Sequence, residues 1–194
     1  MRSQLPADTS KQYLDTVTQE VQRLDRVVKT FIDFNRPLEP RMRECNLVVV
    51  SRTAMSAAER SGSSRVKLSL SADLEHAPVL ADAELSSQAL LNVLVNAIEA
   101  MDDHSGEVKL KLRESFDEYI IDVTDQGAGI PAEIQDKIYN LYFSTKPNAP
   151  GIGLAMTFLV MQLHNGFVEF ESEVGRGTTF RLHFPAFHQN GDVH

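Results

Sequence analysis

The segment LLNVLVNAIEAM, residues 90–101, constrains the fold of this chain more than any other. Apolar residues lie on almost every side of the helix that it predicts, so other elements must cover that helix. Two amides interrupt the pattern, because Asn92 and Asn96 are four residues apart and therefore share one stripe of the helix. A buried amide that lacks a hydrogen-bond partner costs about 1–3 kcal/mol, so the protein or a ligand must supply a partner for each.

Composition narrows the classes of protein to consider. The chain has 194 residues and is 42% hydrophobic, which is enough for one domain with a buried core plus an appendage. Its formal charge of −8 would repel a phosphate backbone, so we expect no nucleic-acid partner. Cys45 is the only cysteine, which excludes a disulfide framework within the chain. No run of about eighteen apolar residues is present, so we expect no membrane contact and place this segment in the cytoplasm.

Residues 10–34, SKQYLDTVTQEVQRLDRVVKTFIDF, predict a long amphipathic helix. Apolar residues recur in it at alternating steps of three and four: Leu14, Val17, Val21, Leu24, Val28 and Phe31. Such a seam packs against another helix, either of the same domain or of a partner. Its position before the proline-containing linker RPLEPRM, residues 36–42, favours a partner helix.

The rest of the chain alternates between helical and strand patterns. Helices are predicted over residues 46–61, with Asn46 as the N-cap, 83–102 and 153–164. Strands are predicted over 66–72, 107–115, 118–125, 167–173 and 178–185, and a short extended stretch over 78–81. This order predicts an α/β two-layer sandwich.

Two glycine-containing segments carry candidate chemistry. Asp125 begins DQGAG at the end of a predicted strand, where a carboxylate can accept from an exocyclic amine while the glycines let a ring approach the backbone. The segment PGIGL, residues 150–154, precedes a predicted helix, where free N–H groups and the helix dipole favour an anion. Each segment alone is equally well explained as an ordinary turn or a flexible loop.

Five motifs in order are more specific. They are the pair Asn92 and Asn96, DQGAG at 125–129, YFSTK at 142–146, GIGLA at 151–155 and GRGTTF at 175–180. Together they resemble the N, G1, F and G2 boxes and the closing strands of the GHKL ATPase superfamily. Within it the chain looks like the catalytic and ATP-binding domain of a sensor histidine kinase of the nitrogen-regulation type. The resemblance implies a Bergerat-type ATP-binding fold with a mixed sheet.

The resemblance also implies a domain organisation. It covers about residues 40–185, and the helix before them is similar to the second helix of the dimerisation and phosphotransfer hairpin of such kinases. We therefore assign residues 1–37 to a partial hairpin, 38–188 to the ATP-binding catalytic domain and 189–194 to a tail. A homodimer is expected, and the segment could be the cytoplasmic part of a larger, membrane-anchored sensor.

The resemblance implies ATP and Mg²⁺ as ligands. Asn96 would ligate Mg²⁺ through its amide oxygen, and Asn92 would assist the metal or its waters, as suits a hard cation that prefers oxygen. Other binding roles follow for residues outside this helix: Asp125 for the adenine amino group, Gly127 and Gly129 for the pocket floor, Thr178 for support of the adenine contact, Gly151, Gly153 and Leu154 for the triphosphate, and Lys146 as a mobile charge on a phosphate.

The residue at position 92 bears on the reaction. Hydrolysing relatives such as gyrase, mismatch-repair and chaperone ATPases usually carry a glutamate there that activates water, and the amide of Asn92 cannot act as that base. The resemblance therefore implies transfer of the γ-phosphate to a histidine, and onward transfer to an aspartate of a response regulator receiver domain.

The chain departs from the family in two places. The phosphoacceptor histidine should precede the helix of residues 10–34, yet no histidine precedes His76; the others are His104, His164, His183, His188 and His194. We therefore expect a fragment that begins inside the hairpin, so that the histidine-bearing helix lies outside this chain; transfer in trans or a lost activity are alternatives. The lid is short as well, because only Pro147, Asn148, Ala149 and Pro150 lie between Lys146 and Gly151. Ala149 also stands where the family usually has the first glycine of the G2 box, and weaker nucleotide retention is expected.

Two other functions stay open. One is a stand-alone protein-serine kinase or ATPase of the same superfamily, such as an anti-sigma factor, against which Asn92 and the N-terminal seam argue. The other is a non-catalytic nucleotide-binding module that serves dimerisation or docking.

Overall fold

The computed structural model of the chain describes residues 17, 18, 21, 38–61, 66–101, 105–146 and 149–187. They belong to two units, Glu39–Phe143 with Gly151–His194, and Met1–Leu38 with Ser144–Pro150, and each unit is described by itself. In the second unit Val17, Thr18 and Val21 are helical, while the remainder of the predicted helix 10–34 lies outside the described residues, as does the predicted tail 189–194.

A mixed sheet forms one layer of the larger unit. Among the described residues it has five strands in the order β2 (Val66–Ala72), β4 (Gly106–Ser115), β5 (Glu118–Thr124), β7 (Gly177–Pro185) and β6 (Phe167–Glu173). β2 runs parallel to β4, and all other neighbours are antiparallel. The predicted strands and the hairpin of β4 and β5 are thus confirmed.

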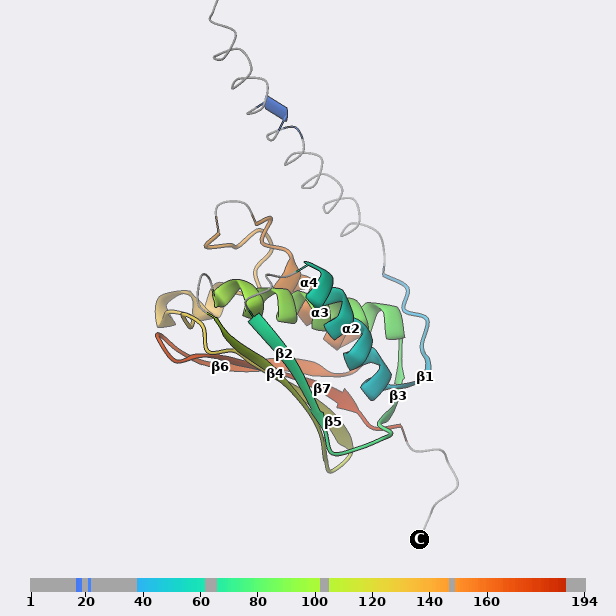
Figure 1. Cartoon of the computed structure of the whole chain (residues 1–194). Coiled ribbons are helices and arrows are strands. Elements are labelled where there is room, and N and C mark those ends of the chain that lie inside the picture. The colour runs from blue at the N-terminus through green and yellow to red at the C-terminus, as the bar shows by residue number, and fades with distance from the viewer. Residues whose placement is uncertain are drawn as a thin grey trace, which may run out of the picture. The chain divides into compact units, whose positions relative to one another are not determined.

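Three helices form the second layer. α2 (Leu47–Ser61), α3 (Ala83–Ala100) and α4 (Gly153–Leu163) cover one face of the sheet (Figure 1). Fully buried side chains of α3, such as Leu90 and Leu94, belong to one apolar cluster with Leu110, Ile121 and Leu182 of the strands. The α/β two-layer sandwich predicted from the sequence is therefore confirmed.

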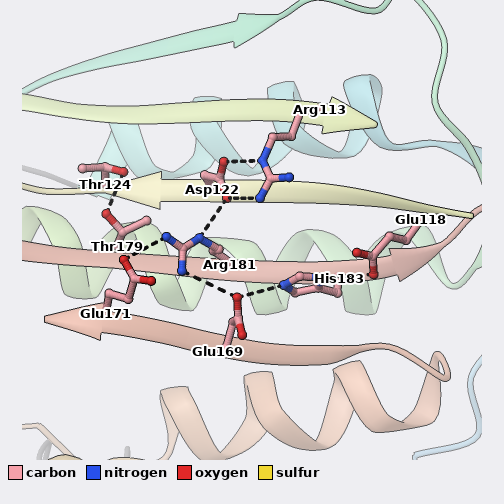
Figure 2. Close-up of polar contacts among 9 residues, drawn as sticks. All are labelled: Arg113, Glu118, Asp122, Thr124, Glu169, Glu171, Thr179, Arg181 and His183. Atoms are coloured by element: carbon pink, nitrogen blue, oxygen red, sulfur yellow. Dashed lines mark hydrogen bonds and ion pairs between the residues drawn. The ribbon is translucent and has the colours of Figure 1, made fainter. Parts of the chain in front are cut away.

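The opposite face of the sheet is polar (Figure 2). The Arg181 guanidinium donates to Glu171 at 3.0 Å and lies 3.5 Å from a carboxylate oxygen of Glu169 and 3.6 Å from one of Asp122. Arg113 Nε donates to the other oxygen of Asp122 at 2.9 Å. Cross-strand pairs of this kind are compatible with solvent, which explains why this sheet can stay covered on one face only.

Side-chain caps fix where the first helices begin. Asn46 Oδ1 accepts from the N–H of Val48 at 3.0 Å and of Ala77 at 3.1 Å, so the predicted cap of α2 also joins the segment before β3. Asp82 Oδ1 accepts from the N–H groups of Glu84 and Leu85 at the start of α3.

Two elements escaped the sequence analysis. The segment Arg43–Asn46, of which only Asn46 had been assigned, as a helix cap, forms β1 and pairs with β3 (Pro78–Ala81) in a small second sheet. The segment Ala132–Lys137 forms a short 3₁₀ helix, η1. β1 has four residues and no alternating apolar pattern, so only its distant partner β3 defines it as a strand.

Candidate functional site

Asn92 has hydrogen-bond partners from the protein itself. Its Nδ2 donates to the carbonyl oxygen of Gly153 at 3.1 Å, and its Oδ1 accepts from Gln88 Nε2 at 3.2 Å. The first amide of α3 is thereby fixed against the start of α4, although an oxygen lone pair is left over for a further contact.

Asn96 differs from Asn92, one turn away on the same helix. Its side chain is half-buried, and it makes no hydrogen bond to any residue that the structure describes. An amide oxygen of this kind fits a hard cation, which takes oxygen ligands and is commonly shared with substrate phosphates. No cluster of three or more His, Cys, Asp or Glu suited to a metal exists among the described residues, so such a cation would rely on Asn96 and on a ligand's oxygens.

Asp125 is a buried carboxylate at the end of β5, with 3% of its surface exposed. Its Oδ1 accepts from the N–H of Gly127 at 2.8 Å and of Thr178 at 3.2 Å. Its own N–H donates to the Thr178 carbonyl at 2.9 Å. The charge is thus held in one orientation by backbone donors, which stabilise an anion in a buried place.

The glycines of the DQGAG loop are required by the packing of the chain. A Cβ on Gly127 would stand 2.5 Å from the carbonyl oxygen of Ala100, at the end of α3. Gly129 has a φ of 72°, and a Cβ there would overlap the carbonyl of Glu173. The protein's own backbone thus already requires glycine at both positions. Contact of a ligand ring with this loop, Gly127 and Gly129 included, stays a prediction.

The start of α4 has the properties of an anion site. Gly151 has a φ of 69°, and Ile152 caps the helix without any side-chain hydrogen bond to its first N–H groups. The first turn holds no acidic residue. The Leu154 side chain packs against the core, so its backbone N–H is the group that could meet a phosphate.

Two polar residues of the site were missed in the sequence. Thr157 of α4 donates, at 3.1 Å, to the carbonyl oxygen of Gly153 and is equally close to that of Ala89, so it fixes the helix start together with Asn92. Ser172 of β6 lies 2.9 Å from Thr178 Oγ1. Both are polar residues at positions where the pattern is otherwise apolar, which is the signal that drew attention to Asn92 and Asn96.

Two remaining residues of the predicted lid take different positions. Phe143 packs against the core. Lys146 belongs to the other unit, where its N–H donates to Ser144 Oγ at 3.0 Å, and its role on a phosphate stays a prediction.

The described histidines have structural partners. His164 is buried, its Nδ1 bonds the Val160 carbonyl at 2.7 Å, and its Nε2 accepts from the N–H of Asp82. His183 is buried on the polar face of the sheet, with Nδ1 3.1 Å from Glu118. His76 bonds Asn46 at 2.9 Å, while His104, His188 and His194 lie outside the described residues.

Comparison with known protein families gives one match to the larger unit. A family model described as "Histidine kinase-, DNA gyrase B-, and HSP90-like ATPase" matches residues 81–188. That range contains all the candidate binding residues named above.

Individual relatives are sensor kinases. The signal transduction histidine-protein kinase AtoS of Escherichia coli K12 is 29% identical over 187 residues, which are 95% of this chain and 31% of AtoS. The sensor histidine kinase ZraS of the same strain is 30% identical over 90% of this chain and 37% of ZraS. The sensory histidine kinase/phosphatase NtrB of Rhodobacter capsulatus is 28% identical over 88% of this chain and 51% of NtrB. The chain therefore spans between 31% and 51% of these relatives' lengths.

Solved structures share the fold. The catalytic domain of histidine kinase ThkA is 26% identical with a TM-score of 0.67 and covers 75% of this chain and 95% of that domain. A complex of ThkA with the response regulator protein TrrA gives a TM-score of 0.75 at 24% identity, over 96% of this chain and 54% of ThkA. Full-length ShkA in complex with AMPPNP gives 0.77 at 20% identity, over 95% of this chain and 40% of ShkA.

Proposed function

Because this chain belongs to the histidine kinase-, DNA gyrase B- and HSP90-like ATPases, as a histidine kinase catalytic and ATP-binding domain, we propose that it binds Mg-ATP and transfers the γ-phosphate to a histidine. The observation that carries the proposal is Asp125, a buried carboxylate held by two backbone N–H groups at the end of β5. A carboxylate that two backbone N–H groups hold in one orientation at the end of a strand can accept a further hydrogen bond, and the amino group of adenine is a suitable donor.

The base would lie against the DQGAG loop. Asp125 accepts from the adenine amino group, the backbone of Gly127 and Gly129 forms the floor, and the Thr178 hydroxyl supports the contact. The fixed position of Asp125 Oδ1 favours this assignment, since a carboxylate that is already oriented loses little freedom when it binds a base.

The phosphates would lie between α3 and the start of α4. Asn96 is the proposed Mg²⁺ ligand, and the N–H groups near Gly151, Gly153 and Leu154 hold the phosphate oxygens. Asn92 acts here mainly by fixing the Gly153 carbonyl, which leaves its amide oxygen for a water of the metal. When bound, Mg²⁺ would neutralise charge on the phosphate oxygens, and Lys146 would add a mobile positive charge.

Transfer is proposed rather than hydrolysis. No carboxylate stands at position 92, and the Asn92 amide is bonded to Gly153 and Gln88, so it cannot remove a proton from water. The bond from the γ-phosphorus to the ADP oxygen breaks, and a bond to an imidazole nitrogen of the acceptor histidine forms. The acceptor is proposed to lie on a partner hairpin helix, and an aspartate of a response regulator to receive the phosphate next.

The cellular setting is part of the proposal. A solved complex of ThkA with the response regulator TrrA is consistent with a receiver-domain partner for this chain as well. No helix in the described part of the chain has the length and apolarity to cross a membrane. We place the activity in the cytoplasm, in a homodimeric kinase.

Thermal unfolding tests the binding step. Mg-ATP at about a hundred times its Kd should stabilise the wild type by about 2.7 kcal/mol, and EDTA should reduce the effect. Asp125→Asn should abolish it, because an amide would present a donor to the adenine amino group, whereas the exposed Asp136→Asn should respond like the wild type. The proposal fails if millimolar Mg-ATP leaves the wild-type transition unmoved.

A further inference from the structure

Ser172 joins three segments beside the proposed base site. Its Oγ accepts from the N–H of Ile130 at 2.8 Å, directly after the DQGAG loop. The same oxygen lies 3.2 Å from the Gly177 carbonyl oxygen and 2.9 Å from Thr178 Oγ1. Gln135 Nε2 strengthens the connection by donating to the carbonyl oxygens of Ile130 at 2.9 Å and Ser172 at 3.4 Å.

The position of Ser172 in its strand is unusual. β6 reads FVEFESE, and Val168 and Phe170 of its alternate positions belong to or pack against the core. Ser172 continues that inward row, where an apolar residue would be expected. A hydroxyl at such a position is costly unless it is bonded, and here three partners surround it.

Proton accounting links Ser172 to Thr178. The Ser172 hydroxyl has one proton and two lone pairs, and Ile130 N–H uses one lone pair. If the proton goes to the Gly177 carbonyl, Thr178 must donate to Ser172, and its own proton is consumed. If the proton goes to Thr178 Oγ1, the Thr178 hydroxyl keeps its proton for a ligand.

The second arrangement suits adenine. Thr178 lies next to Asp125, because Thr178 N–H donates to Asp125 Oδ1 at 3.2 Å. On the adenine ring an acceptor nitrogen stands beside the amino donor. A carboxylate beside a hydroxyl that donates is complementary to this pair of groups, and the Ser172 proton makes Thr178 such a donor.

We propose that Ser172 is a positioning residue for the nucleotide base, which supplies its proton to Thr178 so that the Thr178 hydroxyl donates, directly or through one water, to the ring nitrogen beside the adenine amino group. The inference rests on the proposed function, since it places adenine at Asp125. It goes beyond it by assigning a role to a residue of β6 that lies outside the five sequence motifs.

Two ATP analogues separate the roles of the residues. One lacks the amino group, and the other has carbon in place of the adjacent ring nitrogen. Binding of ATP and of both analogues, with Mg²⁺, is measured by calorimetry for the wild type, Ser172→Ala, Ser172→Thr, Thr178→Val, Asp125→Asn and the exposed control Ser71→Ala. Urea unfolding of each variant reports on folding separately.

Ser172→Ala should weaken the binding of ATP, and of the analogue without the amino group, by about fivefold to tenfold. A change of this size is equivalent to the loss of one hydrogen bond. The same variant should bind the analogue without the ring nitrogen as tightly as the wild type does, because the group to which Thr178 would donate is absent from that analogue. Thr178→Val should show the same pattern, Ser172→Thr should restore wild-type affinity, and Ser71→Ala should have no effect.

The outcomes distinguish the two proposals. If the wild type binds none of the three nucleotides, both are overturned. If Asp125→Asn no longer binds ATP while Ser172→Ala binds it like the wild type, only the inference about Ser172 is overturned. An equal loss for all three nucleotides in Ser172→Ala and Thr178→Val also overturns it, because such a loss indicates a structural role only.

Discussion

Gly153 differs from Gly127 in what surrounds the missing side chain. A Cβ on Gly127 would stand 2.5 Å from the backbone oxygen of Ala100, whereas the nearest atom to a Cβ on Gly153 is Asn92 Cβ at 3.6 Å. The second distance is an ordinary van der Waals contact. The fold therefore requires glycine at 127, but the protein alone does not explain glycine at 153. A phosphate at the start of α4, as proposed above, would explain it.

Substitution by alanine should separate these two roles. Gly153→Ala should change the unfolding free energy by less than about 1 kcal/mol, since the methyl group has room and alanine favours a helix. It should still lower Mg-ATP affinity by at least about tenfold, because the methyl group would stand where a phosphate approaches the helix. Gly127→Ala should cost about 2 kcal/mol or more through the clash with Ala100.

Urea unfolding and calorimetric titration with Mg-ATP measure both quantities. Wild-type affinity in a folded Gly153→Ala protein would show that no phosphate lies at this helix start.

At the residue scale, the sequence pointed to candidate site residues but not to the contacts between them. Asn92 and Asn96 were recognisable because an amide in an apolar stripe demands a partner. Asn92 has a hydrogen-bond partner within the protein because Gly153, 61 residues further along the chain, lies beside it. No local sequence pattern encodes a contact over that separation. Thr157 and Ser172 carry the same signal in weaker form, as single polar residues on apolar faces.

At the scale of elements, Asp82 joins three segments. One carboxylate oxygen caps α3, the other accepts from the N–H of Arg41 at 2.8 Å, and Asp82 N–H donates to Nε2 of His164 at the end of α4. Burial alone would raise the pKa of the Asp82 carboxyl, but hydrogen bonds from the N–H groups of Leu85, Arg41 and Glu84 outweigh it and lower the pKa. The helix that carries the amides is thereby anchored at its start.

Asp82 should contribute to stability in a pH-dependent way. Asp82→Ala should cost about 1 kcal/mol at neutral pH, as the loss of a helix cap does. Because the folded pKa is lowered from 3.8, the stabilisation by the ionised carboxyl is present above pH 3.8 and is lost as the pH falls through the folded pKa. Asp82→Asn keeps a capping oxygen without the titration.

Urea unfolding at about pH 7 and about pH 3 should therefore show a larger loss of free energy in the wild type than in Asp82→Asn. Parallel losses in the two proteins would contradict a role for this carboxyl in the pH dependence.

Elements with a strong periodic pattern were predictable, and elements defined by distant partners were not. The three helices and the five strands of the main sheet follow from periodicity, caps and glycine breaks. β1 escaped prediction because its pairing with β3 spans 38 residues, as between Arg43 and Ala81. η1 escaped because six residues of a 3₁₀ helix carry no repeat and bury none of their side chains.

At the scale of the whole molecule, the site gathers residues from four separate segments of one unit. Asn92 and Asn96 come from α3, Asp125 follows β5, Gly153 begins α4, and Ser172 and Thr178 come from the closing strands. Hydrogen bonds between these segments hold it together, as from Asn92 to Gly153 and from Thr178 to Asp125. We therefore expect the proposed binding site to form only when the two layers are complete.

The apolar seam of the N-terminal segment is a candidate surface for an acceptor helix. Val17 and Val21, two residues of the predicted seam, are helical, and each is 58% exposed in the structure. The histidines that the structure describes in the larger unit, His76, His164 and His183, have structural partners. We therefore expect the seam to bind the histidine-bearing helix.

Glutamate at Val17 and Val21 should then disrupt transfer without affecting ATP binding. Burying a valine contributes roughly 1.5 kcal/mol or more, so the double variant should weaken association with a histidine-bearing helix at least about a hundredfold. Radiolabelled ATP is added to this chain together with a separate helical hairpin that carries the histidine, and acid-labile label on the hairpin is measured. The wild type should label the hairpin and not itself, and the double variant should label it far less while its Mg-ATP affinity stays constant.

The matched control is Gln19→Glu with Gln22→Glu, which adds the same charge outside the seam and should transfer like the wild type. Equal transfer by the two double variants would mean that the seam does not bind the acceptor, and acid-stable label on a serine would indicate a different class of kinase.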